Sequence, residues 1–248
     1  MIGTKKIAVV LPAYNAAKTL VKVVEAIPRN IVDDVILVDD SSSDDTVTIA
    51  KQLGLACFVH PRNRGYGANQ KTCFRHALSR GNDIIVLLHP DYQYSPELIT
   101  PLAHMVASEI YDVALGSRML GKGALIGGMP RHKFVVNKLL TVFQNAMLNQ
   151  HLSEYHTGYR AFSSRFLSQV PYENNSNAFI FDNEILLQAF YLESRIGEIS
   201  CPTRYDANSS SISLLPGLVY AFQVISRTIA YRLTRLGLLK DKLYMSLG

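Results

Sequence analysis

Residues 36–46 read ILVDDSSSDDT, an apolar run that ends abruptly in two aspartates and a polar turn. Together with Val35, the run has four consecutive apolar residues, so neither face of the segment is polar. Such a run is typical of a strand that is covered on both faces, as in a parallel sheet. Four similar runs also predict strands: Ile7–Leu11, Cys57–His60, Ile84–Leu88 and Val113–Leu115.

Helical patterns separate these apolar runs and follow the last of them. We predict helices over Ala17–Ile27, Asp44–Leu53, Ala68–Arg80, Pro96–Ala107 and Arg131–Asn149. Gly54 and Gly81 follow two of them, where a left-handed C-cap is favoured. Strands that alternate with helices imply right-handed βαβ units. The predicted fold class is therefore α/β, Rossmann-like, with a mostly parallel central sheet.

The composition limits the class of protein. Of the 248 residues, 48% are hydrophobic and 18% are charged, which supports a sizeable core and disfavours disorder. Three distant cysteines, Cys57, Cys73 and Cys201, predict neither a zinc site nor a disulfide framework and favour a cytoplasmic location. The net charge of +5 suits anionic partners. Because the basic residues do not cluster with aromatic ones, we expect no nucleic acid among these partners.

Polar and acidic side chains follow the predicted strands. They occur in Pro12-Ala13-Tyr14-Asn15, Asp39-Asp40, His89-Pro90-Asp91 and Ser117-Arg118. Ligands of such sheets bind at the carboxyl ends of the strands, so these residues form the predicted site. No GxGxxG follows the first strand, which argues against a dinucleotide cofactor. Carboxylates beside a diphosphate need a bridging cation, for which Mg²⁺ or Mn²⁺ is suited.

Four motifs occur in the order found in the family 2 inverting glycosyltransferases. They are VVLPAYNAAKTL (9–20), ILVDDSSSDDT (36–46), NRGYGANQKT (63–72) and HPDYQYSPELI (89–99), and TGYRAFSS (157–164) extends the match. The chain resembles this family over about residues 6–166, and the dolichyl-phosphate mannose and glucose synthases in particular. The resemblance implies a GT-A fold and an enzyme that transfers a hexose from a GDP- or UDP-sugar.

The resemblance also implies roles for the residues after the first two strands. Pro12, Tyr14 and Asn15 would flank the nucleotide base and ribose. Asp39 and Asp40 would hold the base or the ribose. The alternative is that these two acids belong to a solvated turn and a helix cap. Such a cap needs fewer carboxylates than the sequence provides here, which favours the binding role.

The metal motif of the family is Asp-x-Asp followed two residues later by Gln. It falls on His89-Pro90-Asp91-Tyr92-Gln93, so Asp91 and Gln93 remain as ligands and a histidine replaces the first aspartate. His89 could bind Mn²⁺ through a neutral imidazole or could pair with the diphosphate. Because Mg²⁺ favours a shell made only of oxygen atoms, the replacement weakens the case for Mg²⁺.

Several cations are implied to contact phosphate groups. Arg118 corresponds to an arginine near the diphosphate and the acceptor phosphate, and Arg131 and Lys133, together with Asn137, resemble positions that grip a lipid phosphate. Lys71 lies one helical turn after Gly67 and could also reach a phosphate. Arg160 either binds phosphate or anchors its own loop.

The expected acceptor is a polyprenyl or dolichyl phosphate, with a glycan hydroxyl as the alternative. A phosphate acceptor is already an anion near pH 7 and needs no general base, whereas a hydroxyl does. Asp182 and Glu184 are the candidate catalytic bases, with Glu154 as a third. Arg118 and Asp91 would stabilise the diphosphate leaving group, directly and through the metal.

We predict a catalytic domain at residues 1–210 and an amphipathic helical segment at 211–248. Phe222, Ile225 and Ile229 recur at helical spacing, with basic residues on another side. This segment could contact the cytoplasmic face of a membrane or a second subunit of a homo-oligomer. Two other functions compete: a nucleotidyltransferase, which would carry a glycine-rich basic signature after the first strand, and a non-catalytic sugar-nucleotide-binding protein, which only His89 favours.

Overall fold

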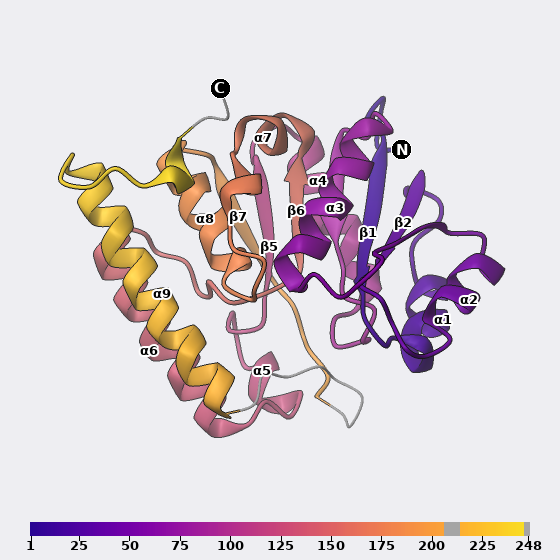
Figure 1. Cartoon of the computed structure of the whole chain (residues 1–248), viewed down its shortest axis with the longest axis horizontal. Helices are drawn as coiled ribbons and strands as arrows, with labels where there is room; N and C mark the ends of the chain where they lie inside the picture. The colour runs from indigo at the N-terminus through magenta and orange to yellow at the C-terminus, as the bar shows by residue number, and fades with distance from the viewer. Residues whose placement is uncertain (206–213, 246–248) are drawn as a thin grey trace.

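A computed structural model of the chain describes residues 1–205 and 214–245, and its centre is a seven-stranded sheet (Figure 1). The strands stand in the order β3-β2-β1-β4-β6-β5-β7. β6 is antiparallel to β4 and β5, and the other neighbouring strands are parallel. We call the edge at which the parallel strands end the carboxyl edge. The strand bounds are β1 Ile7–Ala13, β2 Asp34–Asp39, β3 Ala56–Val59, β4 Ile84–Leu87, β5 Val113–Ser117, β6 Arg160–Ser163 and β7 Ile196–Ser200.

Helices cover both faces of the sheet. On one face lie α1 (Ala17–Glu25), α2 (Thr46–Gln52) and α4 (Ile99–Ala107), and on the other lie α3 (Tyr66–Ser79), α7 (Ser164–Gln169) and α8 (Phe181–Tyr191). Successive β1 residues alternate between the two cores, since Val9 packs with the first layer and Val10 with the second. The short helical turns are η1 Pro96–Leu98, α5 Gly123–Ile126, η2 Tyr172–Asn174 and η3 Lys242–Tyr244.

The α/β fold class and the mostly parallel sheet are confirmed. All five predicted strands and all five predicted helices form, with bounds that differ from the predicted ones by a few residues. The glycine-rich stretch at 120–129 contains the short helix α5. Local sequence patterns did not predict β6, β7, α7 or α8.

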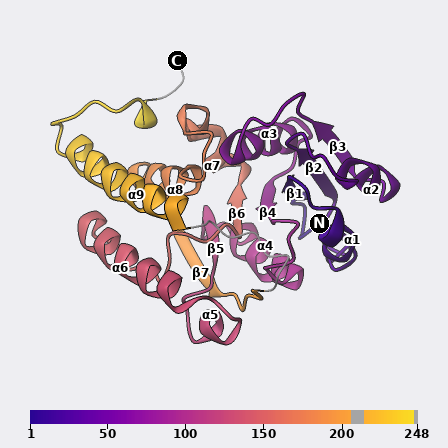
Figure 2. The same ribbon diagram turned by 60° about the horizontal axis from the view of Figure 1, so that its bottom comes forward.

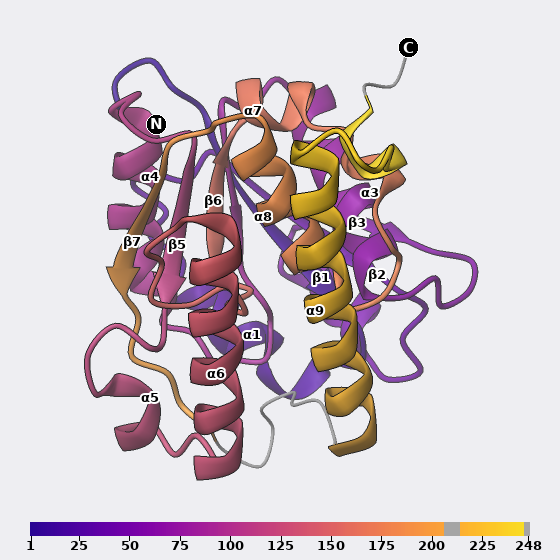
Figure 3. The same cartoon turned by 90° about the vertical axis from the view of Figure 1, so that its left-hand side faces the viewer.

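Two long helices lie side by side (Figure 3) at the β5–β7 end of the sheet, far from α1 and α2 (Figure 2). They are α6 (Arg131–Leu148) and α9 (Leu214–Arg235). Leu140 of α6 and Val224 of α9 are buried together, and Gln144 donates a hydrogen bond to Thr228 Oγ1 at 3.1 Å. The predicted domain boundary at 210/211 lies outside the described residues. Within the described residues, no helix combines the length and hydropathy needed to span a membrane.

Candidate active site at the carboxyl edge

The acidic end of β2 is buried and has hydrogen-bond partners. Asp39 accepts hydrogen bonds from the backbone N–H and the hydroxyl of Ser42. Asp40 accepts from the N–H groups of Arg64 and Gly65, at 2.9 and 2.8 Å, and pairs with His60 Nδ1 at 2.7 Å. The Asp40 carboxylate therefore holds the segment before α3 against the sheet, a role that the sequence did not reveal.

The segment after β1 forms the adjoining part of the edge. Pro12 is buried within β1, whereas Tyr14 is 55% exposed just beyond it. Asn15 has a left-handed backbone, with φ of 53°. Its N–H donates to Ser42 Oγ and its Oδ1 accepts from Ser43 N–H, at 2.8 and 2.9 Å. The loops after β1 and β2 are thus tied together, and the Tyr14 ring is exposed beside them.

A hydrogen-bonded chain links His89, after β4, to α8. Tyr66 donates to Asp182 Oδ2 at 2.5 Å, and Gln70 donates to Asp182 Oδ1 at 2.9 Å. His89 Nε2 lies 3.0 Å from the same Tyr66 oxygen. Burial, with the nearby charge of Asp182, raises the pKa of Tyr66 well above its usual value, so the phenol keeps its proton.

These hydrogen bonds of Tyr66 determine the tautomer of His89. The single proton of the phenol points to the carboxylate, so the Tyr66 oxygen accepts a hydrogen bond from Nε2–H of His89. The Nδ1 atom of His89 then carries a lone pair, and no hydrogen bond of the described residues uses it. A carboxylate that orients a histidine through its second nitrogen is a common device behind metal-binding histidines.

Asp91 and Gln93 lie on the turn that follows His89. Asp91 Oδ1 accepts from the Gln93 N–H at 3.0 Å, and Tyr92 between them has φ of 58°. Gln93 is buried. No group of three or more His, Cys, Asp or Glu side chains in the described parts of the chain has the geometry of a metal site. The turn carries one carboxylate, one imidazole nitrogen and one amide, and donor atoms of these types together suit Mn²⁺ better than Mg²⁺.

Arg118, after β5, forms a buried ion pair with Glu154. Its Nε donates to Glu154 Oε1 at 2.9 Å and its backbone N–H donates to Oε2 at 2.8 Å, while Asn137 of α6 adds a bond of 2.8 Å to Oε1. Burial alone would raise the pKa of Glu154, but Arg118 outweighs it and holds this pKa below its usual value. Glu154 is therefore a poor general base, and Arg118 is held at the carboxyl edge in one orientation.

Arg160 anchors its own loop. Its guanidinium is fully buried and donates to the carbonyl oxygens of Tyr155, Thr157 and Asp182. Gly158 lies two residues before Arg160, and a Cβ atom on it would lie 2.5 Å from His89 Nε2. Only glycine therefore fits between this loop and the histidine.

Other predicted residues lie apart from this cluster. Glu184 is buried, accepts from Ser176 N–H at 2.6 Å, and lies 2.9 Å from Arg227 Nε of α9 outside hydrogen-bond geometry. The Lys71 ammonium is held by the carbonyl oxygens of Glu173 and Asn175 and by Asn177 Oδ1. Lys71 therefore fastens the 173–177 loop to α3.

The 173–177 loop also explains why residue 67 is a glycine. A Cβ on Gly67 would lie 2.3 Å from the Ser176 carbonyl oxygen, and the Gly67 N–H donates to Asn177 O at 2.8 Å. This close approach accounts for the glycine at the start of α3. Arg131 and Lys133 lie in the first turn of α6, where Arg131 is exposed and Lys133 half-buried.

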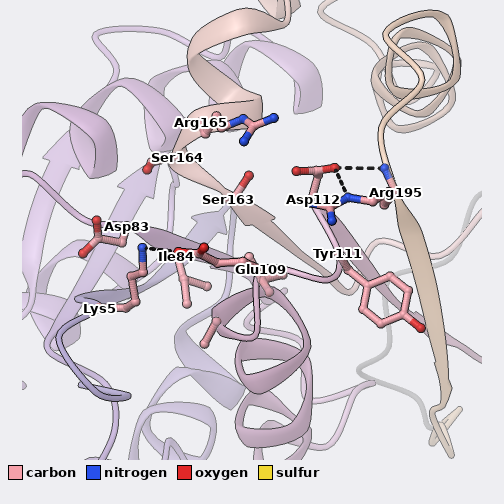
Figure 4. Close-up of a pocket in the computed structure, with 12 residues that line it drawn as sticks. Lys5, Asp83, Ile84, Glu109, Tyr111, Asp112, Ser163, Ser164, Arg165 and Arg195 are labelled. Atoms are coloured by element: carbon pink, nitrogen blue, oxygen red, sulfur yellow. Dashed lines mark hydrogen bonds and ion pairs between the residues drawn. The ribbon is translucent and has the colours of Figure 1, made fainter.

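A cavity of about 310 Å³ lies at the opposite edge of the sheet (Figure 4). Its lining includes two ion pairs, Lys5 with Glu109 at 2.8 Å and Arg195 with Asp112 at 3.3 Å. Opposite charges are balanced within it, and it contains none of the predicted site residues. We therefore place the candidate active site at the carboxyl edge, where the side chains with unusual environments gather.

Solved structures that match this fold contain uridine diphosphate and a divalent cation. Glucosyl-3-phosphoglycerate synthase from Mycobacterium tuberculosis, in complex with Mn²⁺, uridine diphosphate and phosphoglyceric acid, matches with a TM-score of 0.68 at 20% identity. The match covers 96% of this chain and 81% of that one. A second structure of the same enzyme, with Mg²⁺ and uridine diphosphate, has a TM-score of 0.68.

Sequence relatives of similar length include transferases. An uncharacterized protein of Methanocaldococcus jannaschii is 28% identical over 92% of this chain and 94% of its own length. A UDP-N-acetylglucosamine–dolichyl-phosphate N-acetylglucosaminyltransferase of Methanococcus voltae is 26% identical over 82% and 88%. The polyprenol monophosphomannose synthase of Mycolicibacterium smegmatis is 24% identical over 86% and 82%.

The sequence profile described as "Glycosyl transferase family 2" matches residues 8–170, which contain β1 to β6 and every predicted residue of the carboxyl edge up to Arg160. The order of motifs, the sheet and the structural match agree on one architecture. The chain therefore belongs to glycosyltransferase family 2, a glycosyltransferase with the GT-A fold.

Proposed function

We propose that this glycosyltransferase transfers a hexose from an NDP-sugar to a polyprenyl phosphate at the surface of a membrane. The observation that carries the proposal is an apolar, acid-free face formed by α6 and α9 beside the candidate site. Curated relatives with names that specify dolichyl, polyprenol or undecaprenyl phosphate support the acceptor class.

The donor would bind across the ends of β1, β2 and β4. Tyr14 is exposed where a base would stack, and Asn15 and Asp39 organise the loops beside it. Asp91, Gln93 and Nδ1 of His89 would hold a divalent cation, for which Mn²⁺ is the better fit. When bound, such a cation neutralises charge that develops on the diphosphate leaving group. Arg118 supplies a second, fixed positive charge at the same edge.

The chemical state of the buried acids favours a phosphate acceptor over a hydroxyl acceptor. Asp182 already accepts hydrogen bonds from Tyr66 and Gln70, and Glu154 is paired with Arg118. Neither carboxylate is poised to remove a proton from an incoming hydroxyl. A phosphate acceptor is already ionised and attacks without a base, so orientation and charge stabilisation suffice.

The face of α6 and α9 has the properties of a membrane-contact surface. Leu139 and Val142 on α6 are 65% and 64% exposed, and Phe222 on α9 is 73% exposed. Ile126, just before α6, is 81% exposed. A monomeric protein rarely presents so many large apolar side chains on two adjacent helices without a binding partner.

The charge of this face favours anionic lipid over a second copy of the chain. α6 and α9 contain no acidic residue. Arg227 and Arg235 of α9 pair with Glu184 and Glu193, and the two helices carry four further Lys and Arg residues: Arg131, Lys133, Lys138 and Arg232. A two-fold dimer would bring this face against itself and place like charges together. An anionic bilayer attracts each exposed cation near its surface by about 1 kcal/mol.

The proposal is tested with purified protein, Mn²⁺, UDP- and GDP-sugars and undecaprenyl phosphate in mixed vesicles. We expect release of the nucleoside diphosphate together with a new lipid-linked sugar phosphate, detected by mass spectrometry. Replacing Asp91 with asparagine should abolish both products, and replacing the exposed Asp45 should leave them. Pyrophosphate release would instead indicate a nucleotidyltransferase, and transfer only to a glycan hydroxyl would refute the acceptor class.

A further inference from the structure

His156 lies between Arg118 and α9, in the loop that joins α6 to β6. Its carbonyl oxygen accepts a hydrogen bond from Arg118 Nη2 at 2.9 Å. Its ring Nδ1 lies 3.0 Å from the hydroxyl of Tyr220 on α9, and the two rings meet edge to face with centroids 5.6 Å apart. The backbone and the side chain of His156 are therefore both positioned, one by the active-site arginine and the other by α9.

The second ring nitrogen of His156 has no partner. Nε2 is buried and makes no hydrogen bond to any atom of residues 1–205 and 214–245. A buried polar atom without a partner destabilises a fold by about 1–3 kcal/mol, so native proteins rarely leave one unpaired. This atom, in a residue bonded to Arg118, therefore calls for a partner that the described residues do not supply.

The partner of Nδ1 determines what Nε2 offers. A phenol O–H is a stronger donor than the N–H of a neutral imidazole, so Tyr220 donates and Nδ1 accepts. The ring proton then resides on Nε2. Burial lowers the pKa of His156 to about 4; Glu154 opposes this shift, while Arg118 and Arg160 add to it. The ring is therefore neutral at physiological pH and presents a single N–H donor.

The surroundings select an anionic acceptor for this N–H. Arg118 and Arg160 are close enough to influence the ring, and the charge of Glu154 is already neutralised by Arg118. Because Glu154 and Arg118 offset each other's charge, it is Arg160, whose guanidinium donates to carbonyl oxygens, that stabilises a ligand oxygen carrying negative charge. A hydrogen bond to such an oxygen is stronger than one between neutral groups.

We propose that Nε2–H of His156 donates a hydrogen bond to a phosphate oxygen of a bound substrate, and that Tyr220 of α9 orients the ring for this contact. The phosphate is that of the polyprenyl acceptor or of the donor diphosphate. This inference rests on the proposed function, because it assigns a phosphate-contacting residue within that site. Tyr220 is a positioning residue, and it links the active site to the helix that carries the exposed Phe222.

Three variants separate the contact from the fold. His156→Phe keeps a ring but has no N–H, His156→Gln retains a donor, and Tyr220→Phe removes only the orienting hydroxyl. His151→Phe is the matched control, because His151 is an exposed histidine of the same loop. Thermal unfolding of each variant establishes that it folds.

Kinetics with farnesyl phosphate and calorimetric binding of the nucleoside diphosphate identify the source of the phosphate. We expect His156→Phe to raise either the KM for the acceptor or the Kd for the nucleotide by about tenfold to a hundredfold, the loss of one hydrogen bond to a charged group. His156→Gln should recover part of the loss, and Tyr220→Phe should weaken the same constant several-fold. Unchanged constants in a folded His156→Phe protein would overturn the proposal.

A second measurement does not depend on turnover. In ¹⁵N-histidine-labelled protein, NMR should show His156 with its proton on Nε2, and this proton signal should shift when farnesyl phosphate or the nucleotide is added. A proton on Nδ1, or a signal that neither ligand moves, would refute the inference. If the wild-type chain binds these ligands at His156 but transfers no sugar to a polyprenyl phosphate, the proposed function fails and the phosphate contact stands.

Discussion

Replacing Glu154 with glutamine tests the buried charge pair that holds Arg118. In the wild type, Glu154 Oε2 faces the Arg118 N–H, and Oε1 accepts from the guanidinium and from Asn137. The amide NH₂ of a glutamine would place a donor against one of these donors and would leave a buried guanidinium without a counter-charge. Breaking a buried pair in this way costs about 3–5 kcal/mol. For a chain of this size we expect the Tm to fall by roughly 6–20 °C.

The pH dependence of stability gives the same pair a second signature. The folded-state pKa of Glu154 is below its usual value, so the ionised carboxylate stabilises the folded chain. This contribution to the free energy of unfolding is fully present above the unfolded-state pKa of about 4.3 and is lost as the pH falls through the folded-state pKa. Urea unfolding of wild type and variant between pH 7 and pH 3 measures this. The stability difference should be largest near neutral pH and shrink in acid. A glutamine variant as stable as the wild type at pH 7 would refute the reasoning.

A double replacement distinguishes stability from function. Arg118→Met combined with Glu154→Leu removes both charges and restores an apolar contact, which often leaves stability nearly unchanged. We expect this protein to be more stable than the glutamine variant and to lack transfer activity. Activity in the double variant would mean that Arg118 takes no part in the reaction.

Three further outcomes follow from the site and the lipid face. Tyr66→Phe should lower Mn²⁺ affinity in a fluorescence or calorimetric titration by about 10- to 100-fold, because His89 loses the group that orients it; an unchanged Mn²⁺ Kd would contradict the His89 tautomer. Gly158→Ala should reduce activity while the chain still folds, because the new Cβ meets His89 Nε2 at 2.5 Å; full activity would show that the loop yields. Phe222→Glu should weaken co-sedimentation with phosphatidylglycerol vesicles without a fall in Tm. Ile110→Glu, also at an exposed position, should leave co-sedimentation unchanged; equal binding by both variants would contradict membrane contact through α6 and α9.

Local sequence patterns predicted the parallel half of the fold. The apolar runs at β1, β2 and β4 are buried on both faces, so their periodicity is that of a covered strand. β6 was not identified, because it has only four residues and begins with the charged Arg160, which is satisfied by carbonyl oxygens brought close only in the folded chain. α8 was not identified because its burial is nearly complete, which removes the amphipathic signal.

For the site, too, local sequence predicts only part of the arrangement. The strand-end rule identified Asp39, Asp91 and His89 from local sequence. The partners of these and other polar groups are set by contacts far apart in the chain: Asp182 lies 116 residues from Tyr66, and Glu154 lies 36 from Arg118. The charge of Asp182 suggested a catalytic base, and in the folded chain this carboxylate accepts hydrogen bonds from Tyr66 and Gln70. No motif or spacing in the sequence pointed to His156. Its contact with Tyr220 forms only when α9 packs beside this loop in the folded chain.

Crystals soaked with MnCl₂ and an NDP-sugar test the central claim most directly, because manganese is located by its anomalous scattering. We predict a manganese peak between Asp91 and Nδ1 of His89, with the diphosphate bridging it to the Arg118 side of the carboxyl edge. A peak at the opposite edge, in the cavity near Lys5 and Arg195, or a nucleotide bound without contact to Asp91, would contradict it.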